Sequence, residues 1–193
     1  MTGSNDWQQY YSAATGRAPR PHLIAALKHV SRVGTAIDLG AGDGVDSRFL
    51  LDQGWQVVAV DATPGLRERI AASGHASSWL DARDASFAAV DDLPDADLVF
   101  ASYSLPFASV AEFAHIWELL TAALRPRGVF AGQLFGHRDD WAERDDVLTH
   151  SASEVAELLS DWEIVELVER ERDGPSGRGP KHWHFFDIIA RRL

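Results

Sequence analysis

The sequence contains no cysteine, and it has few cationic residues relative to its acids. Disulfides, thiolate metal sites and cysteine nucleophiles are therefore excluded together. The chain has 18 lysines and arginines against 29 acidic residues, so its net charge is −11 at pH 7. Proteins that hold nucleic-acid backbones neutralise phosphates with cations, and this charge argues against nucleic acid as a partner. A small molecule or a peptide is the expected ligand.

The sequence also lacks any apolar run near the roughly 20 residues needed to cross a bilayer. Its first residues, MTGSNDWQQYY, are polar and do not resemble a signal peptide. We therefore expect a cytoplasmic protein with no membrane partner. With 193 residues, 46% of them apolar, the chain suits one domain, in which residues 1–33 form an N-terminal arm and short helix and residues 34–193 form the core. Both a monomer and a homodimer are compatible with this composition.

Strands and helices are expected to alternate through the core. Apolar runs predict strands at residues 36–39, 55–60, 77–80, 98–103, 128–135, 164–171 and 182–190. An apolar stripe from Val110 to Leu124 predicts a helix packed on the sheet, and Ser151 with Glu154 predicts a capping box. This alternation predicts an α/β, three-layer, doubly wound Rossmann-like fold with a seven-stranded, mostly parallel sheet. Because residues 173–180 (DGPSGRGP) read as a hairpin loop, the last strand should be antiparallel.

The most informative segment is residues 36–47, AIDLGAGDGVDS, where an apolar strand runs into a glycine-rich turn. Gly40, Gly42 and Gly44 carry no Cβ and accept positive φ, so a bound adenosine derivative could lie against bare backbone. The dinucleotide fingerprint GxGxxG would need its third glycine at position 45, which is Val45. The turn therefore points away from NAD. An ordinary tight strand-to-helix turn is the alternative.

A second signal is an acid at the tip of the next strand. Residues 55–60 (WQVVAV) end at Asp61, about 20 residues after the glycine turn, where a doubly wound sheet presents a carboxylate to a ribose diol. Asp61 could accept charge-assisted hydrogen bonds from both ribose hydroxyls. Its alternative role is to cap the helix that Pro64 opens, which Thr63 could also do.

Together these features resemble the class I S-adenosylmethionine (SAM) dependent methyltransferases. The turn DLGAGDG is similar to their motif I, residues 95–107 (DADLVFASYSLPF) to motif IV, and residues 124–136 (LRPRGVFAGQLFG) to the element that enters the fifth strand. The segments SLPF, FGHRDDW and KHWHFF resemble a small single-domain branch that includes the tellurite-resistance methyltransferase-like proteins. The resemblance covers nearly the whole chain. It implies the class I methyltransferase fold and methyl transfer from SAM to a small-molecule acceptor, with S-adenosylhomocysteine (SAH) as product.

The resemblance also implies which residues bind the cofactor. Asp38 and the amides of the glycine turn would hold its methionine end, Asp61 its ribose, and Asp84 its adenine amino group, with Asp81 as a competitor for that last role. The complete expected set is Asp38, Gly40, Ala41, Gly42, Gly44, Asp61, Ala62, Asp84, Ala85, Ser102 and Tyr103.

The methyl acceptor is expected beyond the carboxyl ends of the parallel strands, where open α/β sheets collect ligands. The expected catalytic residues are His137, His182 and His184. The expected substrate-binding residues are Tyr11, Arg17, Leu105, Phe107, Arg138 and Trp183. Strand alternation places His182 and His184 on one face and Trp183 on the other. Tyr11 and Arg17 belong to an aromatic N-terminal arm that could close over the site as a lid or simply pack on the helices.

Several alternatives stay open at this stage. Each histidine could act as a general base, or it could be structural, bonded to backbone or to Asp139 and Asp140. A metal site formed by His137, Asp139, His182 and His184 lacks a tight motif, so we assign no metal ligands. The whole protein could instead methylate a peptide or protein, or bind SAM without turnover.

Overall fold

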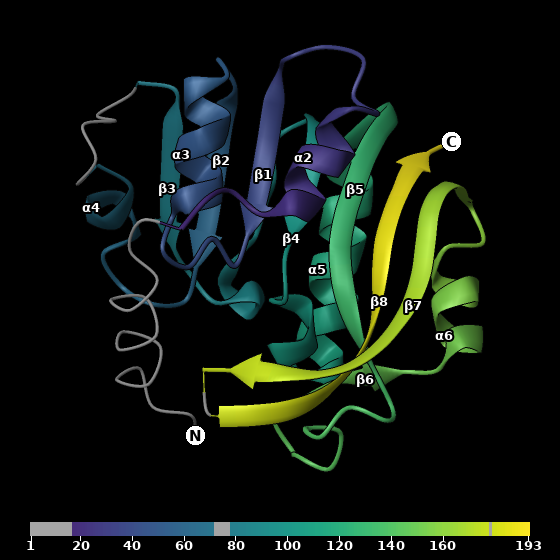
Figure 1. Cartoon of the computed structure of the whole chain (residues 1–193). Helices are drawn as coiled ribbons and strands as arrows, with labels where there is room; N and C mark the ends of the chain where they lie inside the picture. The colour runs from purple at the N-terminus through teal and green to yellow at the C-terminus, as the bar shows by residue number, and fades with distance from the viewer. Residues whose placement is uncertain (1–16, 72–77, 178) are drawn as a thin grey trace.

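The computed structural model describes residues 17–71, 78–177 and 179–193. Within these ranges the chain alternates strands and helices as the sequence predicts (Figure 1). The strands are β1 (Thr35–Leu39), β2 (Gln56–Asp61), β3 (Leu80–Asp84), β4 (Ala96–Ala101), β5 (Leu124–Gly136), β6 (Thr149–His150), β7 (Trp162–Ser176) and β8 (Gly179–Arg192). The helices are α2 (Pro21–Leu27), α3 (Val45–Asp52), α4 (Leu66–Ala71), α5 (Val110–Ala123) and α6 (Ala152–Leu158), with short 3-10 turns η1 (Phe87–Ala89) and η2 (Leu105–Phe107).

The sheet has the strand order β3-β2-β1-β4-β5-β8-β7, and β6 adds a short parallel pairing to β5. Neighbours from β3 to β5 are parallel, whereas β8 is antiparallel to both β5 and β7. The order reverses between β1 and β4, which makes the carboxyl ends of these strands the topological switch point. The predicted Rossmann-like fold with an antiparallel C-terminal strand is confirmed.

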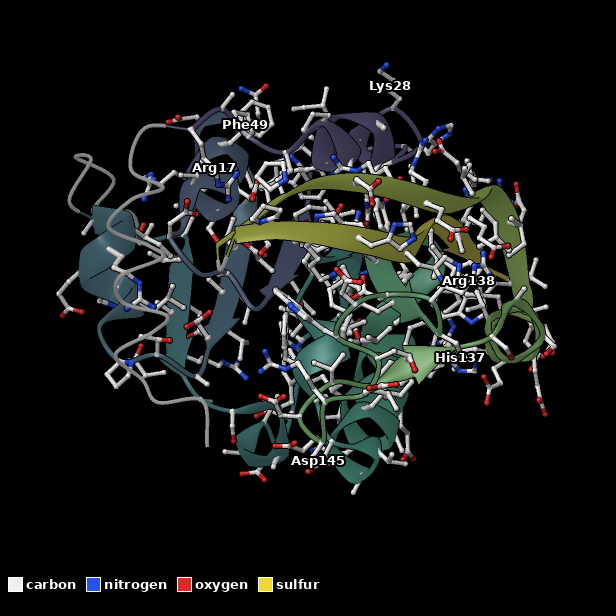
Figure 2. The ribbon with its side chains drawn as sticks, turned by 60° about the horizontal axis from the view of Figure 1, so that its bottom comes forward. Arg17, Lys28, Phe49, His137, Arg138 and Asp145 are labelled. Carbon is white, nitrogen blue, oxygen red and sulfur yellow. The ribbon has the colours of Figure 1, made fainter. Side chains whose placement is uncertain are left out.

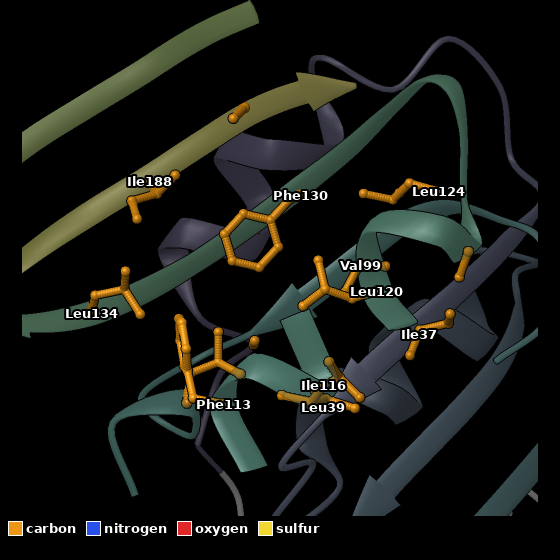
Figure 3. Packing of buried hydrophobic residues seen from close by; sticks show 14 of the residues in the cluster. Ile37, Leu39, Val99, Phe113, Ile116, Leu120, Leu124, Phe130, Leu134 and Ile188 are labelled. Carbon is orange, nitrogen blue, oxygen red and sulfur yellow. The ribbon is translucent and has the colours of Figure 1, made fainter. Parts of the chain in front are cut away.

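Helices cover both faces of the sheet, so the molecule has three layers. One apolar cluster joins α2, α3 and α4 to the sheet through residues such as Leu23, Leu50 and Ile70. The other joins α5 and α6 to the opposite face; its packing includes Phe113 and Phe130 (Figure 3). Burying such side chains yields roughly 1.5–3 kcal/mol each, which makes these two clusters the main stabilisation of the sheet.

Local sequence signals set several helix boundaries. Ser109 and Ser151 each form a full capping box, with Glu112 and Glu154 respectively, and thereby satisfy the first amides of α5 and α6. Gly54, with φ of +84°, follows the end of α3. Within the predicted stripe, Phe113 and Leu120 are buried in α5, whereas Val110 is 72% exposed and Leu124 already begins β5.

Strand boundaries differ more from expectation. The third strand begins at Leu80, where the sequence analysis placed its end, and it pairs with β2 in parallel through Asp84. The short strand β6 was not expected. The largest difference lies at the C-terminus, where most of the segment DGPSGRGP belongs to β7 and β8 and pairing continues to Ser176 and Gly179.

The last two strands therefore project beyond the rest of the sheet. Pairing of β5 with β8 ends at Phe135 and Phe185, but pairing of β7 with β8 continues. We call residues 170–176 and 179–184 the projecting ribbon. Figure 1 shows this ribbon bending to run across below the carboxyl ends of the central strands. The ribbon thus lies over the edge of the sheet at which ligands are expected.

Candidate functional site

The glycine turn after β1 has the predicted backbone geometry. Gly40, Gly42 and Gly44 have φ of +76°, +57° and +71°. Neighbouring side chains also require glycine, because a Cβ on Gly40 would lie 2.2 Å from Ser104 Cβ and one on Gly44 would lie 2.5 Å from Ile70 Cγ1. The amides of residues 40 and 41 donate to the Val60 carbonyl oxygen at 2.8 and 3.0 Å, which fixes the turn to β2.

Asp61 lies at the carboxyl tip of β2 and faces this turn. Its Oδ2 accepts a hydrogen bond from Gly42 N at 2.9 Å, and its Oδ1 accepts one from Thr63 N at 2.8 Å. Arg69 Nη2 lies 3.4 Å from Oδ1. Asp61 is 5% exposed. A carboxylate is therefore held beside the bare backbone of the glycine turn, as the sequence predicts.

Asp38 is buried inside the turn and faces α3. Ser47 Oγ donates to its Oδ2 at 2.6 Å. Burial raises the pKa of Asp38 to about 7, and the negative charge of Asp46 adds to that rise, while the bond from Ser47 and the charge of Arg17 oppose it. A carboxyl group with this pKa is poised between its neutral and charged forms at physiological pH.

Arg17 binds the first residues after the glycine turn. Its guanidinium donates to both carboxylate oxygens of Asp43 at 2.9 Å and to Asp46 at 2.6 Å. The backbone amide of Arg20 donates to the other Asp46 oxygen at 2.8 Å. Figure 2 shows Arg17 beside α3. These bonds tie residues 17–20 to the cofactor side of the sheet edge; Tyr11 lies outside the described residues.

Asp84 and its neighbours lie next to Asp61 in the strand register. The two Asp84 oxygens accept hydrogen bonds from Gly65 N and Leu66 N at 2.8 and 2.9 Å, so this carboxylate caps α4, and these bonds hold its pKa below the usual value. Ala85 N donates to the Asp61 carbonyl oxygen at 2.9 Å. Ala62 is exposed, and Asp81 pairs with Arg83.

The end of β4 presents two unusual features at the switch point. Ser102 Oγ is buried and has no hydrogen-bond partner among the described residues. Tyr103 has a φ of +52°, a left-handed conformation that costs about 1–3 kcal/mol in a non-glycine residue. The backbone amide of Tyr103 donates to Gln133 Oε1 at 3.2 Å, and Gln133 Nε2 donates to Asp187 Oδ1 at 3.0 Å. This buried chain of bonds from β5 to β8 holds Tyr103 in place.

An aromatic group surrounds the Tyr103 ring. Ring centroids of Trp183 and Phe185 lie 5.8 and 5.5 Å from that of Tyr103, both with edge-on geometry. Phe107 packs against Phe135 at 5.8 Å. Trp183 and Phe107 thus lie in one aromatic group with Tyr103 and Phe135, and their contact with substrate stays a prediction. Leu105, expected to contact substrate, instead has no exposed surface and belongs to the core, since the η2 turn points it beneath the edge.

The structure also reveals a buried lysine that the sequence analysis missed. Lys181 Nζ lies 3.7, 4.3 and 4.8 Å from the ring centroids of Trp183, Trp141 and Phe135, and 2.5 Å from Asp139 Oδ2. Lys181 is 4% exposed, and burial lowers its pKa. The ammonium group thus contacts three aromatic rings, from the projecting ribbon, the end of β5 and the segment that follows β5.

His182 lies in ion pairs with acidic side chains of β7. Its Nδ1 is 2.7 Å from Asp173 and its Nε2 is 3.1 Å from Glu171. These two hydrogen bonds, the one to Asp173 first, raise the pKa of His182 above its ordinary value. These bonds favour the protonated ring, whereas a general base acts from the neutral ring.

His184 is buried against the end of β5. Its Nδ1 accepts a hydrogen bond from Arg138 N at 3.0 Å, and its Nε2 lies 2.8 Å from Glu169. His137 is exposed, with Nε2 3.7 Å from Glu154. Figure 2 shows His137 and Arg138 together near α6, away from Arg17. We expected the histidines and Arg138 to surround one pocket, but of these contacts the described residues show that between Arg138 and His184. This geometry favours structural roles for the three histidines.

No group of three histidine, aspartate or glutamate side chains that could hold a metal ion is found in residues 17–71, 78–177 and 179–193. Within the same ranges, no helix is long and apolar enough to span a membrane.

Comparison with known proteins places this geometry in context. A family model described as a methyltransferase domain matches residues 37–130, from β1 into β5. No curated protein sequence matches the chain. Among solved structures, TehB from Haemophilus influenzae is similar with a TM-score of 0.77 and 16% identity, over 97% of this chain and 67% of that one.

Two further structures show the same fold. The 1,6-didemethyltoxoflavin-N1-methyltransferase of Burkholderia thailandensis, solved with 1,6-didemethyltoxoflavin and SAH, has a TM-score of 0.71 and 21% identity, over 98% of this chain and 87% of that one. The N-methyltransferase NodS from Bradyrhizobium japonicum, in complex with SAH, has a TM-score of 0.65 and 14% identity, over 95% and 98% of the two chains.

The family match and the topology define a methyltransferase domain with a Rossmann-like sheet. The fold is similar to that of TehB, and the match of residues 37–130 to a methyltransferase domain agrees with the resemblance to class I SAM-dependent methyltransferases that the glycine turn and the strand pattern predict.

Proposed function

We propose that this protein binds SAM at the glycine turn and transfers its methyl group to a small-molecule acceptor at the adjoining carboxyl ends of β4 and β5. The observation that carries the proposal is the placement of the Asp61 carboxylate against Gly42 N, at the tip of β2 beside the switch point. The solved N-methyltransferases with bound SAH support the choice of cofactor.

The residues present fit such a cofactor. The buried Ser102 Oγ without a described partner is the kind of group that a bound ligand satisfies, because an unpaired buried hydroxyl costs about 1–3 kcal/mol. Asp38 with the turn at residues 40–44 would hold the methionine end, Asp61 the ribose, and the segment from Asp84 to Ala85 the adenine. Ser102 and Tyr103 would lie toward the acceptor.

SAM, when bound, supplies a methyl group already activated by a sulfonium, and its transfer by in-line displacement leaves SAH. The protein must therefore mainly position and desolvate the nucleophile. Tyr103, Phe107 and Trp183 form an apolar wall suited to that task. His137, His182 and His184 stay candidates for proton transfer, and because His182 and His184 lie on the face of β8 opposite Trp183, we propose that positioning contributes more than a dedicated base.

Calorimetric titration with SAH tests the assignment through Asp61→Ala. Loss of charge-assisted bonds to the ribose should weaken SAH binding by roughly 1–3 kcal/mol. Asp91→Ala, in an exposed loop, is the matched control and should bind SAH like the parent. Because Asp61 also bonds Gly42 and Thr63, thermal unfolding of both variants must accompany the titration. An unchanged dissociation constant in a folded Asp61→Ala protein contradicts the ribose assignment.

A further inference from the structure

The projecting ribbon has two chemically different faces. Residues directly opposed in an antiparallel pair share a face. On one face, Glu171 opposes His184 and Asp173 opposes His182. On the other face, the opposed pairs are Arg170 with Phe185 and Arg172 with Trp183. We call the first the acidic face and the second the arginine-aromatic face.

The arginine-aromatic face is the one turned toward the switch point. Trp183 and Phe185, which belong to it, pack edge-on against Tyr103 at the end of β4. The carboxylates of the acidic face instead pair with His182 on the same face and with Arg138, just after the carboxyl end of β5. The ribbon therefore presents rings and guanidinium groups, and not its carboxylates, to the place where the acceptor would lie.

Cationic groups converge on this aromatic wall from two distant parts of the chain. The Arg172 guanidinium carbon lies 5.9 Å from the Phe185 ring centroid, and that of Arg20, just before α2, lies 5.5 Å from the Tyr103 centroid. Arg170 is neutralised by Asp187. Arg172 is exposed, and none of the ion pairs found in the described ranges includes it. Within the described residues, a protein of net charge −11 thus carries at its candidate acceptor wall a guanidinium that has no ion pair and that hydrogen-bonds the Tyr103 hydroxyl.

We propose that the acceptor is a planar aromatic anion, with its ring against Tyr103, Trp183 and Phe185 and its carboxylate or phenolate on Arg172. This inference rests on the proposed function and specifies its substrate class. A guanidinium binds a planar anionic group through two parallel hydrogen bonds, which fixes orientation as well as affinity. Arg172 is then a specificity-determining residue, whereas Lys181, which is buried and bound to Asp139, supports the wall from behind.

The chemistry of Tyr103 agrees with this assignment. Burial raises the pKa of its phenol, and the charge of Asp187 acts in the same direction, whereas the charges of Arg172 and Arg20 and a hydrogen bond from Arg172 oppose the rise. The hydroxyl therefore stays protonated near neutral pH and is a hydrogen-bond donor suited to an anionic oxygen. Because Arg20 is paired with Asp46, a cationic acceptor would meet mainly the repulsion of Arg172 at the same wall.

Equilibrium binding tests the proposal with three probes of one shape: 2-naphthoate, 2-naphthamide and 2-(aminomethyl)naphthalene. Each is titrated calorimetrically into the full-length protein saturated with SAH. The naphthoate should bind about 10-fold or more tightly than the amide, and the amine should bind weakest, since hydrogen bonds between charged groups are about twice as strong as neutral ones. Increasing salt should weaken the naphthoate complex and leave the amide complex nearly unchanged.

Variants then locate the effect. Arg172→Gln should weaken naphthoate about 10- to 100-fold, leave naphthamide within about twofold and leave SAH binding intact. Arg172→Lys should fall between that variant and the parent. Arg127→Gln, an exposed arginine at the opposite, amino-terminal end of β5, is the control and should change none of these constants.

The outcomes separate the two proposals. If SAH binds but naphthoate shows no preference over naphthamide, or if Arg172→Gln weakens both probes equally, the inference is overturned and the proposed function stands. If SAH does not bind, the proposed function fails. Titration of naphthoate and naphthamide into the protein alone then still tests whether the projecting ribbon prefers an anion. Preference for the amine contradicts the anionic assignment directly.

Discussion

Asp38→Asn should make the protein without cofactor more stable above pH 7. Asp38 is fully enclosed, and burial together with the charges of Asp46 and Asp61 raises its pKa from 3.8 to about 7. At neutral pH the fold therefore carries part of the cost of a charged carboxyl group in a buried site. Asparagine has nearly the same shape, removes the charge and keeps an oxygen that accepts the hydrogen bond from Ser47 Oγ.

The sign and size follow from proton linkage. The raised folded pKa means that the native state binds the proton more tightly than the unfolded chain between pH 3.8 and about 7. The contribution of Asp38 to the free energy of unfolding is therefore fully present below pH 3.8, the pKa of the unfolded chain, and is lost as the pH rises through about 7, the pKa of the folded state. The loss approaches about 4 kcal/mol above pH 7, at 1.36 kcal/mol per pKa unit. The advantage of Asp38→Asn should therefore grow from near zero at about pH 4 to several kcal/mol at about pH 8.

Urea unfolding of parent and variant across this pH range measures the difference directly. Asp91→Asn, which removes an exposed carboxylate, serves as the control and should show little pH-dependent difference. The same Asp38 variant should bind SAM less tightly, because the charge assigned to the methionine end is gone. A variant that is less stable than the parent at pH 8, or whose advantage does not change with pH, would refute the reasoning about Asp38.

Three further predictions concern packing and charge. Asp139→Ala should destabilise the protein by about 3–5 kcal/mol because it leaves the buried Lys181 ammonium without its counter-ion. Lys181→Met should cost less, since the amides of Trp141 and His184 still donate to Asp139. Denaturant unfolding compares the free energies of unfolding of the two variants. His182→Gln should lower the melting temperature below pH 6.5, the ordinary pKa of histidine, and this effect should be lost as the pH rises through the raised pKa of the folded state. An effect that grows with pH would contradict the ion pairs. Gly40→Ala should cost about 1–3 kcal/mol in thermal unfolding even without cofactor, since its Cβ would meet Ser104 at φ of +76°; a neutral result would mean that the turn adapts.

The sequence predicts the parts of the site that local chemistry determines. The glycine turn and Asp61 follow from strand periodicity and spacing, and the capping boxes at Ser109 and Ser151 depend only on residues three positions apart. Asp84 illustrates the limit. Its position beside Asp61 is predictable, but its bonds to Gly65 and Leu66 depend on where α4 begins.

The acceptor side depends on contacts between segments that are distant in the sequence, so its geometry could not be predicted from local patterns. Proline and glycine in DGPSGRGP read as a loop, yet these residues lie on an extended hairpin where local turn propensity yields to cross-strand pairing. The sequence did carry a sign of the two faces. In residues 169–173 (ERERD) and 181–185 (KHWHF), a period of two separates arginine and aromatic side chains from acids and histidines. No sequence pattern predicts the aromatic rings around Lys181, since Trp141 and Phe135 belong to other segments of the chain.

A crystal structure of the protein with SAH would locate the cofactor directly. We expect the ribose hydroxyls on the Asp61 carboxylate, the methionine end beside Asp38 and the glycine turn, and the sulfur facing Ser102, Tyr103 and the inner wall of the projecting ribbon. SAH bound away from the glycine turn, or a sulfur remote from the end of β4, would contradict this expectation.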